Sequence, residues 1–452
     1  MASRPNIVFY FTDQQRPDTI GCYGQALPIT PRLDEMAREG VRFERAFTPQ
    51  PVCGPCRAIF QTGRYATDTG CYRNDVMLPR GVKTLANYIE EAGYETAYVG
   101  KWHLASNGTL YGKKDVDHTV TAIPIEYRGG YTGYWRAADV LEFTSHGYDG
   151  YVFDEDNRRV DFKGYRADCI ADMALEYLDG YAGDKPFFLT ISQIEPHHQN
   201  DHHHYEGPVG SKERFARYEL PGDLKALPGD YREEYPDYLG QCASLDENLG
   251  RLIDKLKEKG LYEDTVIIFA SDHGSHFKTR NRDAHLCGGD DYKRTGHDSA
   301  LHVPLIIRGG AFTGGRVEER LVSTESLPKT ILALAGVDVG ERMIGENLCA
   351  LIDSDDPDRP NEVYAQISES RVGRCVRTRD YLYAVYAPEL NGGAYASSPV
   401  YADDYLYDMT KDPYQLNNVV SDPAYAAVKA ALREKLKSWI ERAEHMSVRI
   451  DD

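Results

Sequence analysis

Four short apolar runs constrain the fold of this chain more than any other feature. They cover residues 7–11, 95–99, 187–191 and 266–270. Continuous apolar runs of this length are typical of strands that are buried on both faces of a parallel sheet covered by helices. Each run is followed within a few residues by polar side chains that can carry chemistry. Because ligands bind beyond the carboxyl ends of such strands, we expect these side chains to meet at one edge of the sheet.

Amphipathic helices are predicted between the runs. Residues 30–40 begin with Thr-Pro and end in Gly, which indicates a capped helix. Residues 238–257 place a row of leucines on one helical face. This alternation of strands and helices favours an α/β fold with a large, mostly parallel central sheet flanked by helices.

The last part of the chain has a different pattern. Short runs at residues 362–366 and 381–386, and a helical pattern near residues 425–443, predict a small antiparallel sheet with a helix. The Asp- and Pro-rich stretch at residues 353–361 marks the boundary. We therefore expect an α/β domain over residues 1–360, which carries the chemistry, and a C-terminal α+β subdomain over residues 361–452.

Composition limits the classes of partner and compartment. The 452 residues carry a formal net charge of −19, which argues against a nucleic-acid partner because phosphate backbones are bound by clustered Lys and Arg. The N-terminus lacks the apolar core of a signal peptide, and no stretch predicts a membrane span. Nine cysteines, an odd number, favour reduced thiols and a cytoplasmic location. The sequence leaves the oligomeric state open.

One cysteine motif has more than one interpretation. Cys53-Gly54-Pro55-Cys56 has the form of a thioredoxin-like redox motif. A structural zinc site is disfavoured because no second Cys pair stands at suitable spacing. Pro55 suits the first turn of a helix and Gly63 suits its C-terminal cap, so we expect Cys53 at a helix N-terminus, where an anion is stabilised. This position fits a redox thiol and a nucleophile equally well.

Two acidic residues follow two of the apolar runs. Asp13-Gln14 and Asp272-His273 together offer oxygen ligands and one imidazole, a suitable shell for a hard divalent cation. Either pair alone could equally be a turn or a helix cap. Two such pairs at the ends of two strands favour a metal site.

A longer pattern around Cys53 resembles a known signature. Cys53-x-Pro55-x-Arg57, followed by Thr62-Gly63-Arg64, is similar to the signature of the formylglycine-dependent sulfatases of the alkaline phosphatase-like superfamily. Further segments along the chain resemble the same family. They are Gly100-Lys101-Trp102-His103, Pro196-His197, Lys293 in the block that ends at Val303-Pro304, and the C-terminal stretches 377–381 and 406–413.

The chain also departs from the family pattern. Gln14 and His273 stand where the commonest form has Asp and Asn, and His297, Asp298 and His302 replace a Tyr, a Glu and an Arg. A nitrogen ligand leaves magnesium, manganese and zinc open beside calcium. These departures also resemble the phosphonate and phosphate ester hydrolases of the superfamily, whereas the lysine pair Lys101 and Lys293 resembles true sulfatases.

The resemblance implies a sulfuric ester hydrolase with a modified active-site residue. A formylglycine-generating or radical maturation enzyme would convert Cys53 to formylglycine. A divalent metal, most simply calcium, would be bound by the formylglycine oxygen and by the side chains of Asp13, Gln14, Asp272 and His273.

The resemblance also assigns roles to the remaining residues. The hydrated aldehyde, activated by the metal and Arg57, would attack sulfur, while Lys101 and Lys293 neutralise charge on the sulfuryl oxygens. His197 would protonate the leaving alcohol and His103 would take a proton from the second hydroxyl, since the unperturbed pKa of histidine suits both tasks.

Substrate identity is less constrained. A small sulfated carbohydrate is favoured over a polymer for a cytoplasmic enzyme, and an aryl sulfate remains an alternative. Candidate substrate-binding residues are Asn74, His198, His297 and His302. Two readings from other functional classes also remain, namely a non-catalytic binding protein in which Cys53 is never converted and a thiol-disulfide oxidoreductase that uses Cys56.

Overall fold

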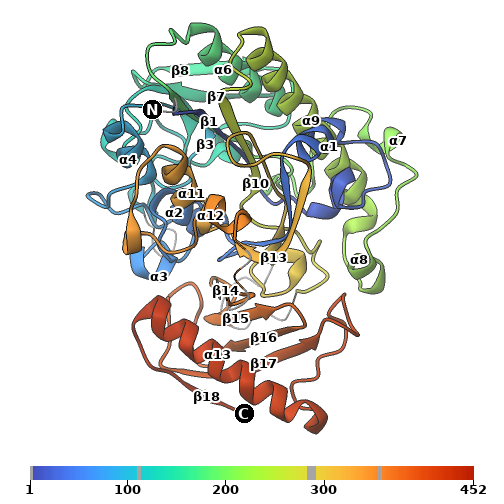
Figure 1. The fold of residues 1–452 in the computed structure, drawn as a ribbon. Helices are drawn as coiled ribbons and strands as arrows, with labels where there is room; N and C mark the ends of the chain where they lie inside the picture. Colours follow the sequence, from blue (N-terminus) through green and yellow to red (C-terminus); the bar gives the residue numbers. More distant parts are fainter. Residues whose placement is uncertain (1–3, 109–113, 282–291, 355, 357–358) are drawn as a thin grey trace.

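The four predicted strands lie side by side in the centre of an 11-stranded sheet (Figure 1). The computed structural model describes residues 4–108, 114–281, 292–354, 356 and 359–452. In sheet order the strands are β11 (His302–Val303), β2 (Val41–Phe47), β12 (Leu305–Arg308), β10 (Thr265–Ser271), β1 (Asn6–Thr12), β9 (Phe187–Ser192), β3 (Glu95–Lys101), β6 (Tyr134–Ala138), β7 (Asp149–Asp154) and β8 (Arg159–Lys163), with β13 (Arg316–Ser323) beside β2.

The centre and the flanks of this sheet differ in strand direction. The five consecutive strands β10, β1, β9, β3 and β6 run parallel, as expected. Beyond them, β12 joins β10 antiparallel, and β7 and β8 follow β6 as antiparallel neighbours. The sheet is therefore mixed, because connections as short as the one from β7 to β8 allow only an antiparallel return.

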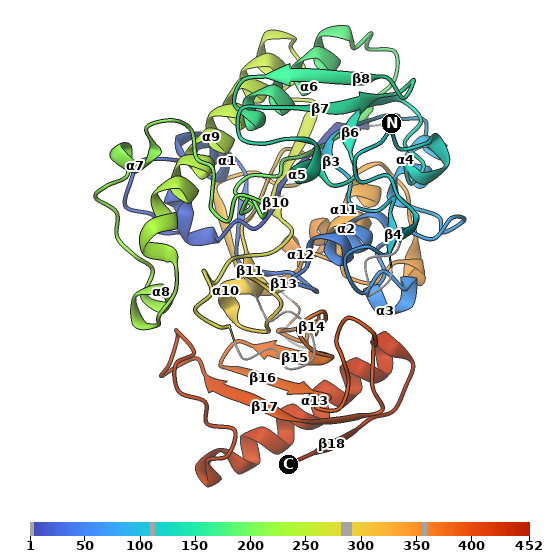
Figure 2. The same cartoon turned by 180° about the vertical axis from the view of Figure 1, so that it is seen from behind.

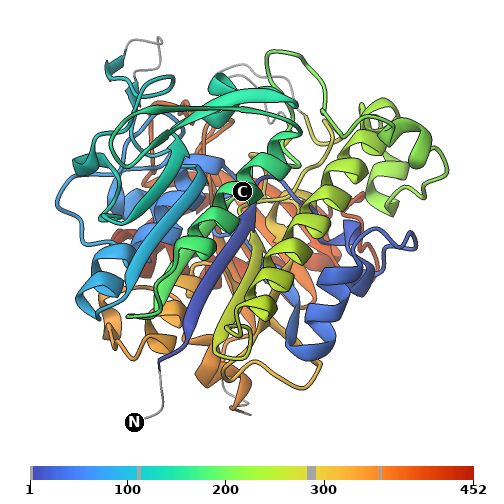
Figure 3. The same cartoon turned by 90° about the horizontal axis from the view of Figure 1, so that it is seen from above.

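Alternate residues of β1 pack into two separate cores, one on each face of the sheet. Ile7, Phe9 and Phe11 pack on one face, and Val8 and Tyr10 pack on the other. The first face is covered by α2 (Cys53–Thr62), α4 (Leu85–Glu91), α11 (Ser326–Leu334) and α12 (Leu348–Ile352). The second is covered by α1 (Pro31–Glu39), α6 (Arg166–Gly180) and α9 (Tyr231–Glu258), of which α6 and α9 run along the strands in Figure 3. A strand that is buried on both faces has no polar face, which explains the continuous apolar runs.

The predicted helices are present, with one difference in extent. The helix expected over residues 30–40 is α1, which ends where Gly40 donates to Met36 O. The helix expected over residues 238–257 is α9, which begins earlier, at Tyr231. Pro236 lies inside α9, and a proline ordinarily marks a helix start. The structure extends the helix past it because Tyr231, Tyr235 and Tyr238 pack in one aromatic cluster.

The C-terminal part forms a second sheet that lies below the first in Figures 1 and 2. Its strands, in order, are β14 (Glu362–Ile367), β15 (Gly373–Thr378), β16 (Tyr381–Tyr386), β17 (Val400–Asp408) and β18 (Arg449–Asp451). The first four are antiparallel, and β18 joins β17 in parallel. Helix α13 (Ala426–Glu444) packs on one face. The other face packs against Phe47, Leu301 and Leu321 of the larger part.

The remaining elements are short. They are α3 (Ala66–Thr69), α5 (Leu141–Thr144), α7 (Ser211–Arg214), α8 (Gly222–Ala226), α10 (Asp298–Leu301) and the pair β4 (Asn107–Gly108) and β5 (Lys114–Val116). The eight cysteines among the described residues are all free, and Cys287 lies outside them. Within the same residues, no helix combines the length and the apolar character that a membrane crossing needs.

Candidate active site

Side chains that follow the four central strands meet at the carboxyl edge of the sheet. Asp13 follows β1, Asp272 and His273 follow β10, Lys101 ends β3, and His197 follows β9. All five are buried. The parallel registry of the strands explains this convergence, because it brings the carboxyl ends of neighbouring strands to one edge.

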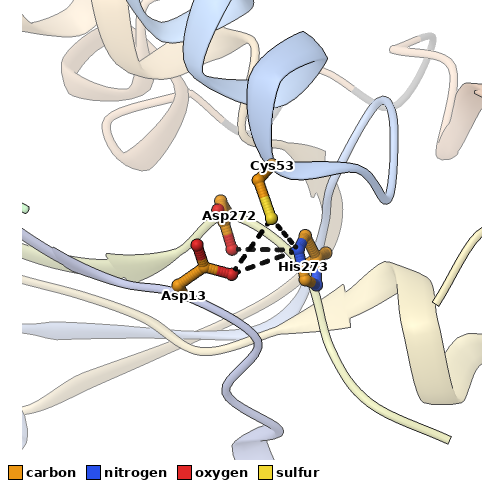
Figure 4. A group of neighbouring side chains, drawn as sticks. All are labelled: Asp13, Cys53, Asp272 and His273. Atoms are coloured by element: carbon orange, nitrogen blue, oxygen red, sulfur yellow. Dashed lines mark hydrogen bonds and ion pairs between the residues drawn. The ribbon is translucent and has the colours of Figure 1, made fainter. Parts of the chain in front are cut away.

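Cys53 completes this group from the other side of the site. It is the first residue of α2, which ends at Gly63 with the positive φ of 61° that favours glycine. Its Sγ lies 3.3 Å from Asp13 Oδ1 and 3.3 Å from His273 Nε2 (Figure 4). The helix expected from Pro55 and Gly63 is therefore present, and it places Cys53 at the strand ends.

Four of these residues form a candidate metal site. The ligand atoms of Asp13, Cys53, Asp272 and His273 all lie within 4.8 Å of one another. Asp272 Oδ2 accepts no hydrogen bond from the described residues although it is buried. Its one described partner there is the Arg57 guanidinium, whose Nη2 lies 3.4 Å away. Two carboxylates and an imidazole suit a divalent cation. The donor set therefore fits a divalent cation.

The two carboxyl groups of this site differ in their pKa. Burial and the nearby Asp13 charge raise the pKa of Asp272 to about 6. Burial lowers the pKa of His273, but the Asp272 carboxylate outweighs it and the net pKa rises to about 9. Burial raises the pKa of Asp13, but Lys101, His197 and His273 outweigh it, and the net pKa lies well below the usual range. Asp13 is therefore the first of the two carboxyls to ionise.

Cationic side chains surround Cys53. Lys293 Nζ lies 2.9 Å from Cys53 Sγ and 3.1 Å from His197 Nε2. Burial and the Asp13 charge raise the pKa of the Cys53 thiol, but Lys293, Lys101 and His273 outweigh them, and the net pKa lies well below the usual range. The site is thus built to hold negative charge at the position of Cys53 Sγ.

Arg57 and Lys101 bind the carboxylate oxygen of Asp13 that is not the neighbour of Cys53. Arg57 Nη2 lies 3.0 Å from Asp13 Oδ2, and Lys101 Nζ lies 2.9 Å from the same oxygen. Lys101 also binds Glu142 Oε1 at 3.1 Å. Glu142 was missed by the sequence analysis, because it lies in the short α5 in a stretch without a recognisable motif. Only the tertiary fold brings it to Lys101.

The two histidines expected to transfer protons have different surroundings. Burial and then Lys293 lower the pKa of His197. His103 has a positive φ of 60°, and its backbone N–H donates to Asp139 O at 2.7 Å. Burial raises the pKa of Glu142, but Lys101, His197 and His103 outweigh it, and the net pKa is about 2. His103 follows the end of β3 by two residues, so it lies near Lys101.

The remaining predicted residues contact different neighbours of this group. Gln14 donates its amide N–H to Tyr205 and Ser275. Asn74 Oδ1 accepts from the Gly54 N–H at 2.9 Å, so it contacts the start of α2. His198 packs against the ring of Tyr292, which precedes Lys293.

His297 and His302 have their described contacts in the interface with the C-terminal sheet. The His297 ring stacks on Tyr405, with centroids 4.5 Å apart. His302 stacks on Phe47 and is hydrogen-bonded to Glu44 O. Asp298 between them pairs with Arg377 of β15. No described contact joins either histidine to Cys53, so their assignment to substrate binding stays a prediction.

Comparison with known proteins identifies the family of the chain. The sequence profile of the sulfatase family matches residues 5–337, and that of the N-sulphoglucosamine sulphohydrolase C-terminal region matches residues 290–442. The chain is 29% identical to an ulvan-active sulfatase from Formosa agariphila over 96% of this chain and 80% of that protein. It is 25% identical to an N-acetylglucosamine-6-O-sulfatase from Bacteroides thetaiotaomicron over 96% and 86%.

A solved structure shares the fold. It is that of a candidate sulfatase, YidJ, from Bacteroides fragilis, with a TM-score of 0.79, 23% identity and coverage of 98% of this chain and 96% of that one. The expected fold class, a large sheet flanked by helices with a separate C-terminal antiparallel sheet, is confirmed.

Proposed function

The chain belongs to the sulfatase family and is a sulfuric ester hydrolase. We propose that it hydrolyses the sulfate monoester of a small carbohydrate and that residue 53 supplies the nucleophile. The observation that carries the proposal is the position of Cys53 Sγ. It lies at a helix N-terminus, 2.9 Å from Lys293 Nζ and 3.3 Å from both Asp13 and His273. A nucleophile at this point is next to the cations that a sulfate group needs.

Cys53 is proposed to act after oxidation to formylglycine. The aldehyde hydrates, and its hydroxyl supplies the nucleophile that a thiol would not provide for this reaction. The motif from Cys53 to Arg64 supports this, together with membership of the sulfatase family. A maturation enzyme of the formylglycine-generating or radical class would be the partner of the newly made chain.

A divalent cation, calcium in the first instance, is proposed between the two strand ends. Asp13, Asp272 and His273 would hold it together with the oxygen on residue 53, and Gln14 could add an amide oxygen. The cation supplies positive charge that compensates the paired carboxylates and polarises the nucleophile. Removal of the metal with a chelator is expected to abolish turnover, and readdition of calcium is expected to restore it.

The chain's own residues perform the remaining tasks. Lys101 and Lys293 would bind the sulfuryl oxygens, and Arg57 would hold Asp13 and the nucleophile. His197 would protonate the leaving oxygen. Its lowered pKa favours a neutral ring, but a bound sulfate brings negative charge beside Lys293, which raises the pKa again and lets the ring carry the proton. His103 would accept the proton of the second hydroxyl on residue 53, so that sulfate leaves and the aldehyde is restored.

The depth of the site requires a sulfate that projects from its carrier. Cys53, Asp13, Lys101 and His273 are each at most 1% exposed, so only a sulfate that projects from its carrier can reach them. The N-acetylglucosamine-6-O-sulfatase among the relatives supports a sugar as the carrier. Asn74 and His198, which lie beside the start of α2 and Tyr292, are the proposed contacts to that sugar.

Two measurements test the function. Intact-mass analysis of protein produced with its maturation enzyme is expected to show a loss of about 18 Da, since an aldehyde oxygen replaces SH2. Turnover of positionally defined sulfated sugars is then compared with turnover of an aryl sulfate. Cys53→Ala is expected to abolish turnover, whereas Cys56→Ser leaves it unchanged. A thiol-disulfide exchange activity that Cys56→Ser abolishes would instead support a thiol-disulfide oxidoreductase.

A phosphonate or phosphate monoester hydrolase is the second candidate. Gln14 and His273 at the metal site favour it, because both replace the residues of the commonest sulfatase form. Lys101 and Lys293 beside Asp13 and Cys53 favour the sulfate ester. Faster cleavage of a phosphonate monoester than of its sulfate analogue would make the second candidate the better one.

A further inference from the structure

A carboxylate from the C-terminal sheet reaches two segments of the active site. Glu369 lies in the loop between β14 and β15, with a positive φ of 64° and a side chain only 17% exposed. Its Oε1 accepts a hydrogen bond from the Asn74 N–H at 2.6 Å. Its Oε2 accepts one from Arg294 Nε at 2.5 Å. Each oxygen therefore binds a different segment of the α/β part.

The first segment leads to Cys53. Asn74 Oδ1 accepts from the Gly54 N–H at 2.9 Å, and Gly54 is the residue after Cys53. The contact is close, because a Cβ on Gly54 would lie 3.0 Å from that oxygen. The hydrogen bond to Glu369 fixes the Asn74 backbone, and Asn74 in turn fixes the first turn of α2.

The second segment leads to Lys293. Arg294 follows it with a positive φ of 65°. Its backbone N–H donates to Pro51 O at 3.3 Å, and its carbonyl accepts from Ser370 Oγ at 2.7 Å. The loop of Glu369 therefore binds both the side chain and the backbone of Arg294, one residue from the ammonium that contacts Cys53.

The charge of Glu369 strengthens both contacts. Burial raises the pKa of its carboxyl, but the Arg294 guanidinium and the Asn74 N–H outweigh it, and the net pKa lies below the usual value. Both hydrogen bonds are therefore made by an ionised carboxylate, and such bonds are shorter and stronger than neutral ones.

We propose that Glu369 is a positioning residue of the sulfatase reaction, which sets the distance between Cys53 and Lys293 by binding the segments of both. It forms no described hydrogen bond with Cys53 or with the Lys293 ammonium, although the Lys293 charge also acts on its carboxylate. Its hydrogen bonds therefore reach the two residues through Asn74 and Arg294. The inference rests on the proposed function, because its kinetic consequence is defined only for a reaction at Cys53.

Two variants separate the two contacts. In Glu369→Gln the side-chain oxygen can still accept from Asn74, while the amide NH2 faces Arg294 Nε and cannot bind it. In Glu369→Ala both contacts are lost. Glu444→Gln is the matched control, since Glu444 is a buried carboxylate bound to Arg374 in the same sheet and contacts neither Asn74 nor Arg294.

Kinetics provide the first measurement. We expect kcat to fall about tenfold in Glu369→Gln and about a hundredfold in Glu369→Ala, with KM changed less than about threefold. The reason is that a displacement of reacting groups by about 1 Å lowers the reaction rate while the protein stays folded. Glu444→Gln is expected to lower the thermal midpoint with kcat per folded molecule unchanged. Glu369→Ala with kcat within about twofold of the parent would overturn the proposal.

Amide hydrogen exchange provides a second measurement that needs no substrate. Exchange of residues 292–297 is expected to quicken about tenfold in both Glu369 variants, and exchange of residues 51–57 and 72–75 only in Glu369→Ala. An equal increase along the whole chain would overturn the proposal, since it reports general destabilisation. If the parent protein cleaves no sulfate ester, the proposed function fails, but the exchange pattern still decides whether Glu369 holds these segments.

Discussion

Buried charges occur in both sheets, and their surroundings differ. In the C-terminal sheet, Arg374 binds both oxygens of Glu444 and also donates to Gly373 O and Ala396 O. At the edge of the large sheet, Glu142 Oε2 accepts no hydrogen bond within the described chain, and Asp272 Oδ2 has only an ion pair with Arg57 Nη2 at 3.4 Å. A charge with all its partners stabilises a fold, whereas buried charges left partly unsatisfied indicate that a ligand supplies the missing contacts.

The largest effect is expected from breaking the closed pair of the C-terminal sheet. Arg374→Ala leaves Glu444 buried and uncompensated, so the free energy of unfolding should fall by about 3–5 kcal/mol, while kcat of the folded enzyme stays unchanged. Denaturant unfolding and turnover measure the two quantities. A fall in kcat per folded molecule of Arg374→Ala would show that this pair, like the active-site charges, contributes to the reaction.

Lys293→Ala should show the opposite behaviour. Lys293 forms no ion pair among the described residues, and its contacts are Cys53 and His197. We expect kcat to fall about 10²- to 10³-fold, as for other groups that stabilise transition-state charge, with a change in stability below about 1 kcal/mol. Lys278→Ala, which removes an exposed lysine paired with Asp230, is the control and should leave kcat unchanged. A large loss of stability in Lys293→Ala would show that Lys293, like Arg374, stabilises the fold.

The buried carboxyl of Glu325, which lies between the two sheets, allows a test by pH. Burial raises its pKa to about 7, and it is hydrogen-bonded to Tyr65 and Ser323. The folded state therefore keeps a proton that the unfolded state loses above its ordinary pKa of about 4.5. Stability should fall as pH rises between these two values, by up to about 3 kcal/mol.

The variant Glu325→Gln isolates this contribution. Its side chain cannot ionise. Its free energy of unfolding should therefore equal that of the parent near about pH 4.5 and exceed it above about pH 7. Urea unfolding of both proteins at the two pH values measures the difference. An equal difference at both values would show that Glu325 does not titrate in this range.

The smallest effect is expected from an exposed pair of the C-terminal part. Lys435 on α13 lies 2.7 Å from Glu362 Oε2, and its side chain is half exposed. Lys435→Ala should change the free energy of unfolding by less than about 1 kcal/mol and should not change kcat. A thermal melt compared with that of Arg374→Ala shows whether burial, and not the presence of an ion pair, sets the magnitude.

Much of the fold could be predicted from the pattern of apolar residues. The four central strands and α1 lie close to the predicted positions because a strand buried on both faces and a capped amphipathic helix each have a distinct local pattern. The early start of α9 was not predicted, because the aromatic packing that tolerates Pro236 involves residues distant in sequence.

The site was only partly predictable for the same reason. Asp13, Cys53, Asp272 and His273 could be named because each directly follows a strand or begins a helix. Glu142 and Glu369 carry no local pattern, and their partners Lys101 and Arg294 are 41 and 75 residues away along the chain.

By itself the sequence determined which residues can form strands and which polar side chains follow them, because these depend on local periodicity and short motifs. Tertiary structure alone decided which charges are closed pairs and which are left open, since burial and partner distance depend on how remote segments pack. That difference separates Arg374 and Glu444, which pair with each other in the C-terminal sheet, from Lys293 beside Cys53, which forms no ion pair among the described residues.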